Sequence, residues 1–142
     1  MLSKITKTIT LPYSPAQMFS LVDRVEDYPL FVPWCLNSQV HSRSTEQVRA
    51  SIQVGTGALG YSLTTLNRLE PDKHIAIQLV AGPFKHLEGL WQFERSPEGS
   101  KISLHLSFEL NLLLRRALEP FIEKIGDRIM QAFCERAAVL YG

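Results

Sequence analysis

The period of the apolar residues changes once, at Asn111, and this change constrains the fold more than any other feature of the chain. Before it, from residue 4 to residue 110, most segments alternate apolar and polar residues in short runs typical of half-buried β-strands. After it, apolar residues recur every three or four positions, as on one face of an amphipathic helix. The pattern predicts an α+β fold in which a long helix follows the strands.

The strand-like runs are separated by turns at spacings that suit an antiparallel sheet. The clearest run is the last one, where five apolar residues from Ile102 to Leu110 alternate with polar ones. The predicted strands are 4–11, 36–44, 47–55, a strand beginning at Tyr61, 75–79, 87–93 and 102–110. Because sheets of this size twist and curl, we expect a curved antiparallel sheet of six to seven strands.

One or two short helices are predicted after the first strand. Ser14 is placed as an N-cap, Pro15 as the first helical residue and Gln17 as the partner that closes a capping box. A second short helical turn is predicted through Asp27, where Pro29 would end it.

The closing helix is predicted to be about 22 residues, or about 33 Å, long, which is enough to cross the sheet. Asn111 and Glu119 are candidate caps, and Pro120 is expected to open the main segment or to kink it. A straight helix over a curved sheet leaves space between them. An empty hollow of about 300 Å³ would cost on the order of 7 kcal/mol. Large side chains, collapse or a ligand must therefore fill it.

The segment EDYPLFVPWCL, residues 26–36, is apolar although Pro29 and Pro33 make it an irregular connection. Connections normally run over the surface and are polar. The segment therefore either folds inward as part of the core or forms the wall of a site for an apolar molecule.

Composition excludes several classes of protein. Fifteen basic and fourteen acidic residues give a net charge of +1, so no overall field favours nucleic acid or an anionic membrane. Cys35 and Cys134 are far apart in sequence, which suits reduced thiols in a cytosol, and the four histidines lack zinc-ligand spacing. The alternating start is unlike a signal peptide, and no run approaches the about 18 apolar residues of a membrane span. The length suits one domain, residues 1–142.

Four segments, in order, resemble a known family. DYPLFVPWC resembles the YPxFxPWC signature of the coenzyme Q-binding and ribosome-association-toxin branch of the START-like superfamily, also called SRPBCC or polyketide cyclase/dehydrase-like. The further matches are VGTGALGYSLTTLNRLEP at 54–71, GPFKHLEGLWQF at 82–93 and LEPFIEKIGDRIMQAFCERA at 118–137. Two departures are Leu66, where the family usually has a basic residue, and Gly126, where alanine is more frequent.

The resemblance implies a helix-grip fold, in which the curved sheet wraps the C-terminal helix and a tunnel between them takes lipid-like molecules. It implies a non-enzymatic carrier or chaperone for a polyprenyl quinone such as ubiquinone, supporting respiration, with no required cofactor, no metal and no catalytic residue. Tyr61 or Trp91 would recognise the headgroup. The residues expected to line the tunnel are Phe31, Val32, Pro33, Trp34, Tyr61, Leu63, Leu79, Leu87, Trp91, Phe93, Leu106, Phe121, Ile125 and Ile129.

Two alternatives stay open. The resemblance also implies a toxin that binds the 50S ribosomal subunit and blocks 70S formation. A weaker alternative is a cyclase or aromatase with Glu88, Glu109 or Tyr61 as acid or base. The expected location is the bacterial cytoplasm, with peripheral contact at the inner membrane, and the sequence predicts no particular oligomeric state.

Overall fold

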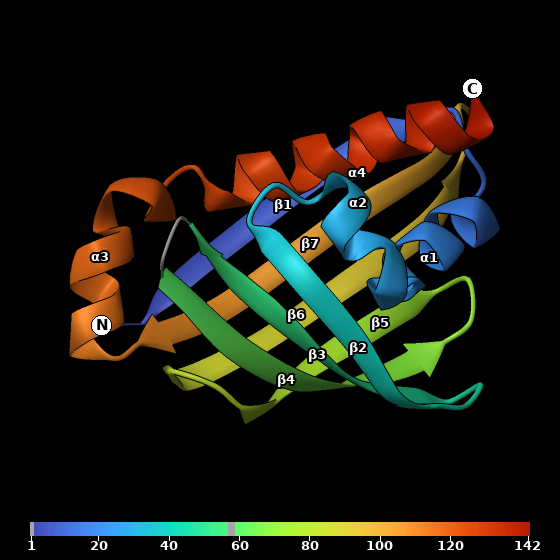
Figure 1. The fold of residues 1–142 in the computed structure, drawn as a ribbon. Coiled ribbons are helices and arrows are strands. Elements are labelled where there is room, and N and C mark those ends of the chain that lie inside the picture. The colour runs from blue at the N-terminus through green and yellow to red at the C-terminus, as the bar shows by residue number, and fades with distance from the viewer. Residues whose placement is uncertain (1, 57–58) are drawn as a thin grey trace.

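The computed structural model describes residues 2–56 and 59–142, with the side chains of all of these except residues 56, 59, 117 and 121. Within this described part, seven strands form one antiparallel sheet in the order β1-β7-β6-β5-β4-β3-β2 (Figure 1). The strands are β1 (Ser3–Leu11), β2 (Cys35–Arg43), β3 (Gln47–Thr56), β4 (Leu59–Glu70), β5 (His74–Ala81), β6 (Phe84–Ser96) and β7 (Gly99–Leu110). The predicted helix-grip sheet is confirmed.

The helices cover one face of this sheet, which we call the concave face. They are α1 (Pro15–Asp23), the 3-10 helix η1 (Val25–Asp27), α2 (Tyr28–Phe31), α3 (Leu112–Ile122) and α4 (Ile125–Tyr141). The 17 residues of α4 make a helix about 25 Å long that runs along the sheet, whereas α3 stands at one end of it (Figure 1). Among the described residues, no helix is long and apolar enough to cross a membrane.

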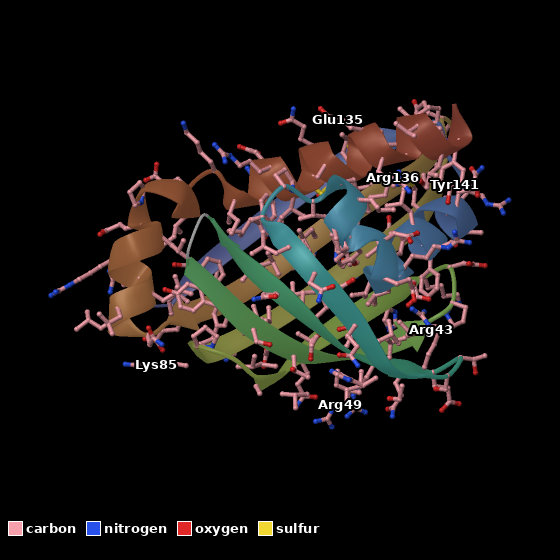
Figure 2. The ribbon with its side chains drawn as sticks, viewed as in Figure 1. Arg43, Arg49, Lys85, Glu135, Arg136 and Tyr141 are labelled. Carbon is pink, nitrogen blue, oxygen red and sulfur yellow. The ribbon has the colours of Figure 1, made fainter. Side chains whose placement is uncertain are left out.

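The start of α1 follows the sequence prediction. The Gln17 backbone N–H donates to Ser14 Oγ over 3.1 Å, and the Ser14 N–H donates to Gln17 Oε1 over 2.9 Å, so the capping box is closed. The Tyr141 hydroxyl donates to the Gln17 carbonyl over 3.0 Å and joins the last turn of α4 to α1 (Figure 2). Two elements distant in sequence are thus fixed together at this end of the sheet.

Two helix predictions were wrong in detail. Pro29 does not end the helical turn but sits at the second residue of α2, where a helix does not need the backbone N–H that proline lacks. The predicted long C-terminal helix is present as α4, but the helical segment before it is a separate helix, α3, which ends before residues 123–124. Pro120 neither opens nor kinks the long helix; it lies inside α3, which ends two residues later. The Leu114 N–H donates to Asn111 Oδ1 over 3.0 Å, so Asn111 is confirmed as a cap.

Gly126, in the first turn of α4, brings this helix close to β1. A Cβ atom at this position would lie 2.5 Å from Ile5 Cγ2 and 3.1 Å from Lys7 Cε. Because real side-chain contacts are longer than 2.5 Å, alanine would require α4 or β1 to move. The departure from the family pattern at this position thus accompanies a close helix-to-strand contact.

Candidate functional site

Burial on the concave face varies along the strands: on β7 it falls from Leu104 to Leu106 and rises again at Phe108 and Leu110, next to α3. The cross-strand pairs Phe93–Ile102 and Trp91–Leu104 identify the residues of this face, and Ile75 pairs with Trp91 on the next strand. These five side chains are 1–4% exposed. Other side chains of this face, on the same side of these five as α3, are half-buried, and they are Ile52, Val54, Tyr61, Leu63, Ile77, Leu79, Leu87 and Leu106. The helices therefore cover these side chains less completely than they cover the five buried ones.

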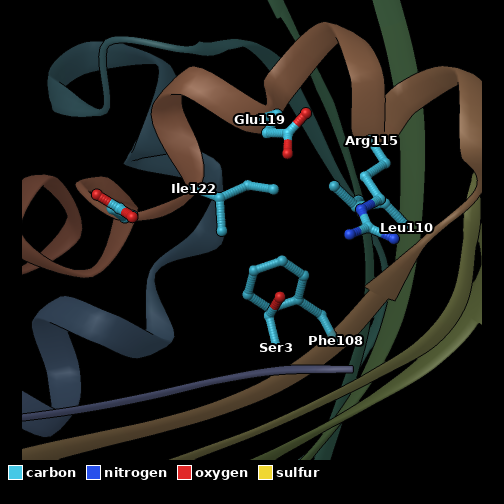
Figure 3. A pocket seen from close by; sticks show the side chains of 7 residues that line it. Ser3, Phe108, Leu110, Arg115, Glu119 and Ile122 are labelled. Carbon is cyan, nitrogen blue, oxygen red and sulfur yellow. The ribbon is translucent and has the colours of Figure 1, made fainter. Parts of the chain in front are cut away.

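A hollow of about 240 Å³ lies at this end, between α3 and the sheet (Figure 3). Its lining residues are Ser3, Phe108, Leu110, Arg115, Glu119, Ile122 and Glu123. Phe108 and Leu110 come from β7 and form an apolar floor, to which Ile122 contributes from α3. Arg115 and Glu119 come from α3 and give the hollow a charged rim.

A second hollow, of about 340 Å³, lies between β1 and α4. Its lining residues are Lys7, Thr8, Ile9, Asp127, Met130, Gln131 and Cys134. The Lys7 ammonium and the Asp127 carboxylate form an ion pair of 2.8 Å across it. Burial raises the pKa of the Cys134 thiol, so its thiolate form is disfavoured. The lining residues of both hollows differ from the residues predicted to line the tunnel.

Several of the predicted tunnel residues lie together at the α3 end. Tyr61, Leu87 and Leu106 pack against a buried cluster of Phe108, Leu110 and Leu114, which we call the α3-end cluster.

Three more predicted residues are half-buried at or near the same end. A Cβ atom on Gly82 would lie 2.9 Å from Leu63 Cδ1 and 3.5 Å from Leu79 Cδ1, so these two leucines converge. The Trp34 carbonyl accepts a hydrogen bond from the Gly55 N–H over 3.1 Å. Trp34 therefore lies beside the end of β3, where Val54 pairs with Tyr61.

Other predicted tunnel residues belong to the packed core. The Trp91 and Phe93 rings stack with centroids 6.4 Å apart, and the Phe133 ring meets Trp91 edge-on at 5.1 Å. The Phe31 ring lies 5.2 Å from the Phe133 ring, with the Arg136 guanidinium 5.4 Å from its centroid. Ile129 also packs against this core. These side chains fill the end of the concave face that is remote from α3.

The apolar segment at residues 26–36 is folded inward over part of its length, as one of its two predicted alternatives requires. Tyr28 donates its hydroxyl hydrogen to the Val22 carbonyl, and burial raises the pKa of this phenol. Val32 is buried, Pro33 is exposed and Trp34 is half-buried near the α3 end. The segment thus contributes Tyr28, Val32 and Cys35 to the interior, and Trp34 lies half-buried beside the end of β3. Ile125 is half-buried at the first residue of α4, and the side chain of Phe121 lies outside the described residues.

Three charged residues at the hollow were missed by the sequence analysis. Arg115, Glu119 and Glu123 belong to a mixture of basic and acidic residues along the helical pattern, which predicts a solvated face on one continuous helix. The break at residues 123–124 instead turns α3 over the end of the sheet. Phe108, Leu110 and Ile122 were recognisable as apolar-face residues, but no signal in the sequence brought the charged residues to them.

Of the three candidate acid–base residues, Tyr61 alone faces the helices. Glu88 pairs with Ser107, one position away from the concave-face pair Leu87–Phe108, so Glu88 lies on the opposite face of the sheet. Glu109 follows Phe108 in β7 and lies on that opposite face as well. Among the described residues, no group of three or more His, Cys, Asp or Glu side chains is arranged to hold a metal ion.

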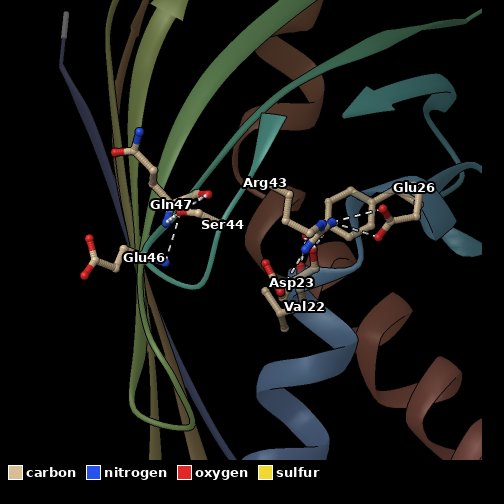
Figure 4. Close-up of polar contacts among 8 residues, drawn as sticks. Val22, Asp23, Glu26, Arg43, Ser44, Glu46 and Gln47 are labelled. Carbon is tan, nitrogen blue, oxygen red and sulfur yellow. Dashed lines mark hydrogen bonds and ion pairs between the residues drawn. The ribbon is translucent and has the colours of Figure 1, made fainter. Parts of the chain in front are cut away.

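A charged cluster joins the end of β2 to α1 and η1 (Figure 4). Arg43 Nη1 donates to Asp23 Oδ2 over 2.9 Å, and Arg43 Nη2 donates to both carboxylate oxygens of Glu26 over 3.0 Å. Burial raises the pKa of Asp23, and the Arg43 guanidinium opposes this rise. The cluster thus fixes an edge strand to the helices that precede it.

Replacing Arg43 with Gln is expected to lower the free energy of unfolding by about 1 to 2 kcal/mol at pH 7, because two carboxylates lose their partner. The pKa of Asp23 in the folded state should then rise further above its ordinary value of 3.8. A protein with a carboxyl group whose pKa is raised in the folded state becomes less stable as the pH rises through that pKa. The loss of stability caused by Arg43→Gln should therefore be smaller at pH 4 than at pH 7. Urea denaturation at the two pH values measures both.

The matched control for Arg43 is Lys73, which pairs with Glu70 over 3.4 Å in a more exposed position. The Lys73→Gln variant should change stability by no more than about 0.5 kcal/mol. Equal effects of the two substitutions would contradict a structural role for the Arg43 cluster.

Comparison with known proteins identifies the family of this chain and finds relatives with the fold described above. A family model described as polyketide cyclase/dehydrase and lipid transport matches residues 11–134. The Pseudomonas aeruginosa protein named ribosome association toxin RatA is 39% identical over 144 residues, covering 100% of both chains. The Xenopus laevis mitochondrial coenzyme Q-binding protein COQ10 homolog B is 29% identical over 138 residues, covering 93% of this chain and 57% of that protein.

A solved structure extends this similarity to the fold. The Zhui aromatase/cyclase of Streptomyces sp. R1128 superposes with a TM-score of 0.83 at 15% identity, covering 97% of this chain and 94% of that one. At this identity the likeness concerns the fold alone. The family model spans most of the strands and helices described above, and the full-length relative adds a close sequence match. The chain therefore belongs to the polyketide cyclase/dehydrase and lipid transport family.

Proposed function

We propose that the protein binds a lipid-like molecule on the concave face near α3, without catalysing a reaction. The observation that carries this proposal is the loss of burial from Leu104, at 1% exposed, to half-buried Leu106 on the same strand and face. Each methylene group that a ligand buries against such side chains contributes about 0.8 kcal/mol and needs no polar partner. An apolar tail is the ligand part that this surface suits best.

A polyprenyl quinone is the ligand that we propose, with ubiquinone as the type. The hollow of about 240 Å³ is below the range of about 300 to 1,000 Å³ typical of small-molecule sites. The ligand must therefore also occupy the half-exposed concave face, as a long isoprenoid tail would. The 29% identical relative named as a coenzyme Q-binding protein supports this ligand class.

Titration with decyl-ubiquinone tests the proposal. Trp34 and Trp91 both lie on or beside the concave face, so a bound quinone should quench their fluorescence saturably at one ligand per chain. Quenching that only rises in proportion to quinone concentration, as for free tryptophan in solution, would contradict the proposal.

A second proposed function is association with the large ribosomal subunit, as the family branch implies. It is supported by the 39% identity over the full length of the relative named ribosome association toxin. Purified protein added to dissociated ribosomal subunits should migrate with the 50S peak in a sucrose gradient and reduce the 70S peak. An unchanged 70S peak without co-migration would remove this function. Lipid binding and ribosome association are measured by different assays, so each function can be tested independently of the other.

We also propose that a carrier of this kind contacts membranes through the first turn of α3. Leu112 and Leu113 are 63% and 83% exposed there. The Asn111 N–H donates to the Pro83 carbonyl, which holds the start of β6, with exposed Lys85, next to this helix start. Exposed leucines beside Lys85 and Arg116 suit the interface of an anionic bilayer.

Replacing both leucines with serine should lower co-sedimentation with phosphatidylglycerol-containing vesicles at least threefold, because two apolar anchors are lost. Val139 is 74% exposed on α4 and provides the control, since Val139→Ser should leave co-sedimentation unchanged. Equal binding to these vesicles by the wild-type protein, the double leucine variant and Val139→Ser would contradict the proposed contact.

A further inference from the structure

We propose that the hollow beneath α3 holds the polar headgroup of the ligand, and that Arg115 donates a hydrogen bond to a neutral carbonyl oxygen of that headgroup. This inference rests on the proposed binding of an apolar tail on the concave face. It assigns the recognising residue and the chemical class of the headgroup.

The position of the hollow is the first step. Its floor residues Phe108 and Leu110 belong to the α3-end cluster, against which Tyr61, Leu87 and Leu106 pack. The floor is thus continuous with the half-buried apolar surface of the neighbouring strands. A tail lying on that surface would bring its headgroup to the hollow, where the lining changes from apolar to charged.

The side chain of Arg115 is the second step. Figure 3 shows its guanidinium projecting from α3 toward Leu110 and Phe108, inside the hollow. Arg115 already makes an interaction within the chain. A guanidinium has five N–H donors in a planar fork, and one carboxylate engages at most two of them. The group can therefore keep an intramolecular partner and still donate to a ligand.

The charge of the lining is the third step, and it selects the headgroup. Arg115 contributes one positive charge, whereas Glu119 and Glu123 contribute two negative charges, so the formal charge of the lining is −1. A phosphate or carboxylate headgroup would meet net repulsion there. A neutral acceptor, such as a quinone carbonyl, gains the hydrogen bond from the guanidinium without that repulsion.

Three probes with similar tails and different heads test the assignment: decyl-ubiquinone, decylbenzene and dodecyl phosphate. Their dissociation constants are measured by displacement of the neutral dye Nile red from the full-length protein. The test variant is Arg115→Met, which keeps an apolar stem and removes the donors. The matched control is Arg116→Met, since Arg116 is the next residue on the same helix, is exposed and does not line the hollow.

We expect Arg115→Met to weaken decyl-ubiquinone binding about tenfold or more, as for the loss of a hydrogen bond from a charged donor. Decylbenzene binding should change less than twofold, and Arg116→Met should change neither. The Glu119→Gln/Glu123→Gln double variant should strengthen dodecyl phosphate binding at least threefold, because the lining becomes positively charged.

Three different results would overturn the inference. If the wild-type protein binds both decyl-ubiquinone and decylbenzene but Arg115→Met weakens neither or both equally, the headgroup assignment is wrong while lipid binding stands. If none of the probes displaces Nile red from the wild-type protein, both the inference and the proposed lipid binding fail. Tighter binding of dodecyl phosphate than of decyl-ubiquinone by the wild-type protein would reject the neutral headgroup class.

Discussion

Replacement of Phe133 with alanine is expected to lower the free energy of unfolding by about 3 to 5 kcal/mol, the range for deletion of a large buried aromatic side chain. Phe133 is 6% exposed, and its ring lies between 5.1 and 5.5 Å from the rings of Trp91, Phe31 and Tyr28. It therefore joins α4 to both the sheet and α2. Urea denaturation followed by far-ultraviolet circular dichroism measures the change.

Two control variants separate packing from a general effect on α4. Phe133→Leu retains much of the apolar volume and should cost less than half as much as the alanine variant. Val139→Ala, on the exposed side of the same helix, should change stability by no more than about 0.5 kcal/mol. A loss below about 1 kcal/mol for Phe133→Ala would contradict its place at the centre of the core.

Replacement of Leu106 with tryptophan is expected to weaken decyl-ubiquinone binding at least tenfold while changing the free energy of unfolding by less than about 1 kcal/mol. Leu106 is half-buried and lies over Gly89, whose absent Cβ would be 3.0 Å from Leu106 Cδ2. A larger side chain at this position would occupy the space proposed for the ligand. Nile red displacement and urea denaturation measure the two quantities.

Leu104 is the matched control, because it lies two residues earlier on the same face of β7 and is 1% exposed. Leu104→Trp has no free space to enter and should lower stability by about 1 to 3 kcal/mol or more. If Leu106→Trp destabilises the protein as much as Leu104→Trp, the α3 end of the concave face is packed solid. Unchanged ligand affinity in Leu106→Trp would place the ligand elsewhere.

The sheet was predictable from sequence because alternation in a strand reflects directly which side chains face the core. The run from Ile102 to Leu110 maps onto β7, and its apolar members pair with Phe93, Trp91 and Leu87 of β6. The capping box of α1 was equally readable, because Ser14 and Gln17 interact within four residues of each other. Local patterns of this kind need no knowledge of tertiary structure.

The break between α3 and α4 was not predictable in the same way. The apolar stripe continues from Leu118 through Ile122 and Ile125, so the helical period carries no signal of the change in direction. The change depends on what α3 packs against, namely the end of β7 and the start of β1 around the hollow. The packing of α3 on the sheet, which no local sequence pattern predicts, therefore places Arg115 at the hollow.

The described side chains among the residues predicted to line a tunnel differ in their burial. Their apolar character was recognisable, but burial separates Trp91 and Phe93, at 4% exposed, from half-buried Tyr61, Leu63 and Leu79. This difference depends on whether α1, α2 and α4 reach a given part of the sheet. Sequence alone identified the face and could not separate its buried side chains from its half-buried ones.

Analysis of co-purifying lipids tests lipid binding most directly. The protein, produced in a quinone-synthesising bacterium and purified without detergent, is extracted with organic solvent and the extract analysed by mass spectrometry. We predict ubiquinone in molar amounts that follow the protein through the final column, with at least tenfold less from Leu106→Trp. An extract of the wild-type protein that contains no quinone or other lipid would contradict the account.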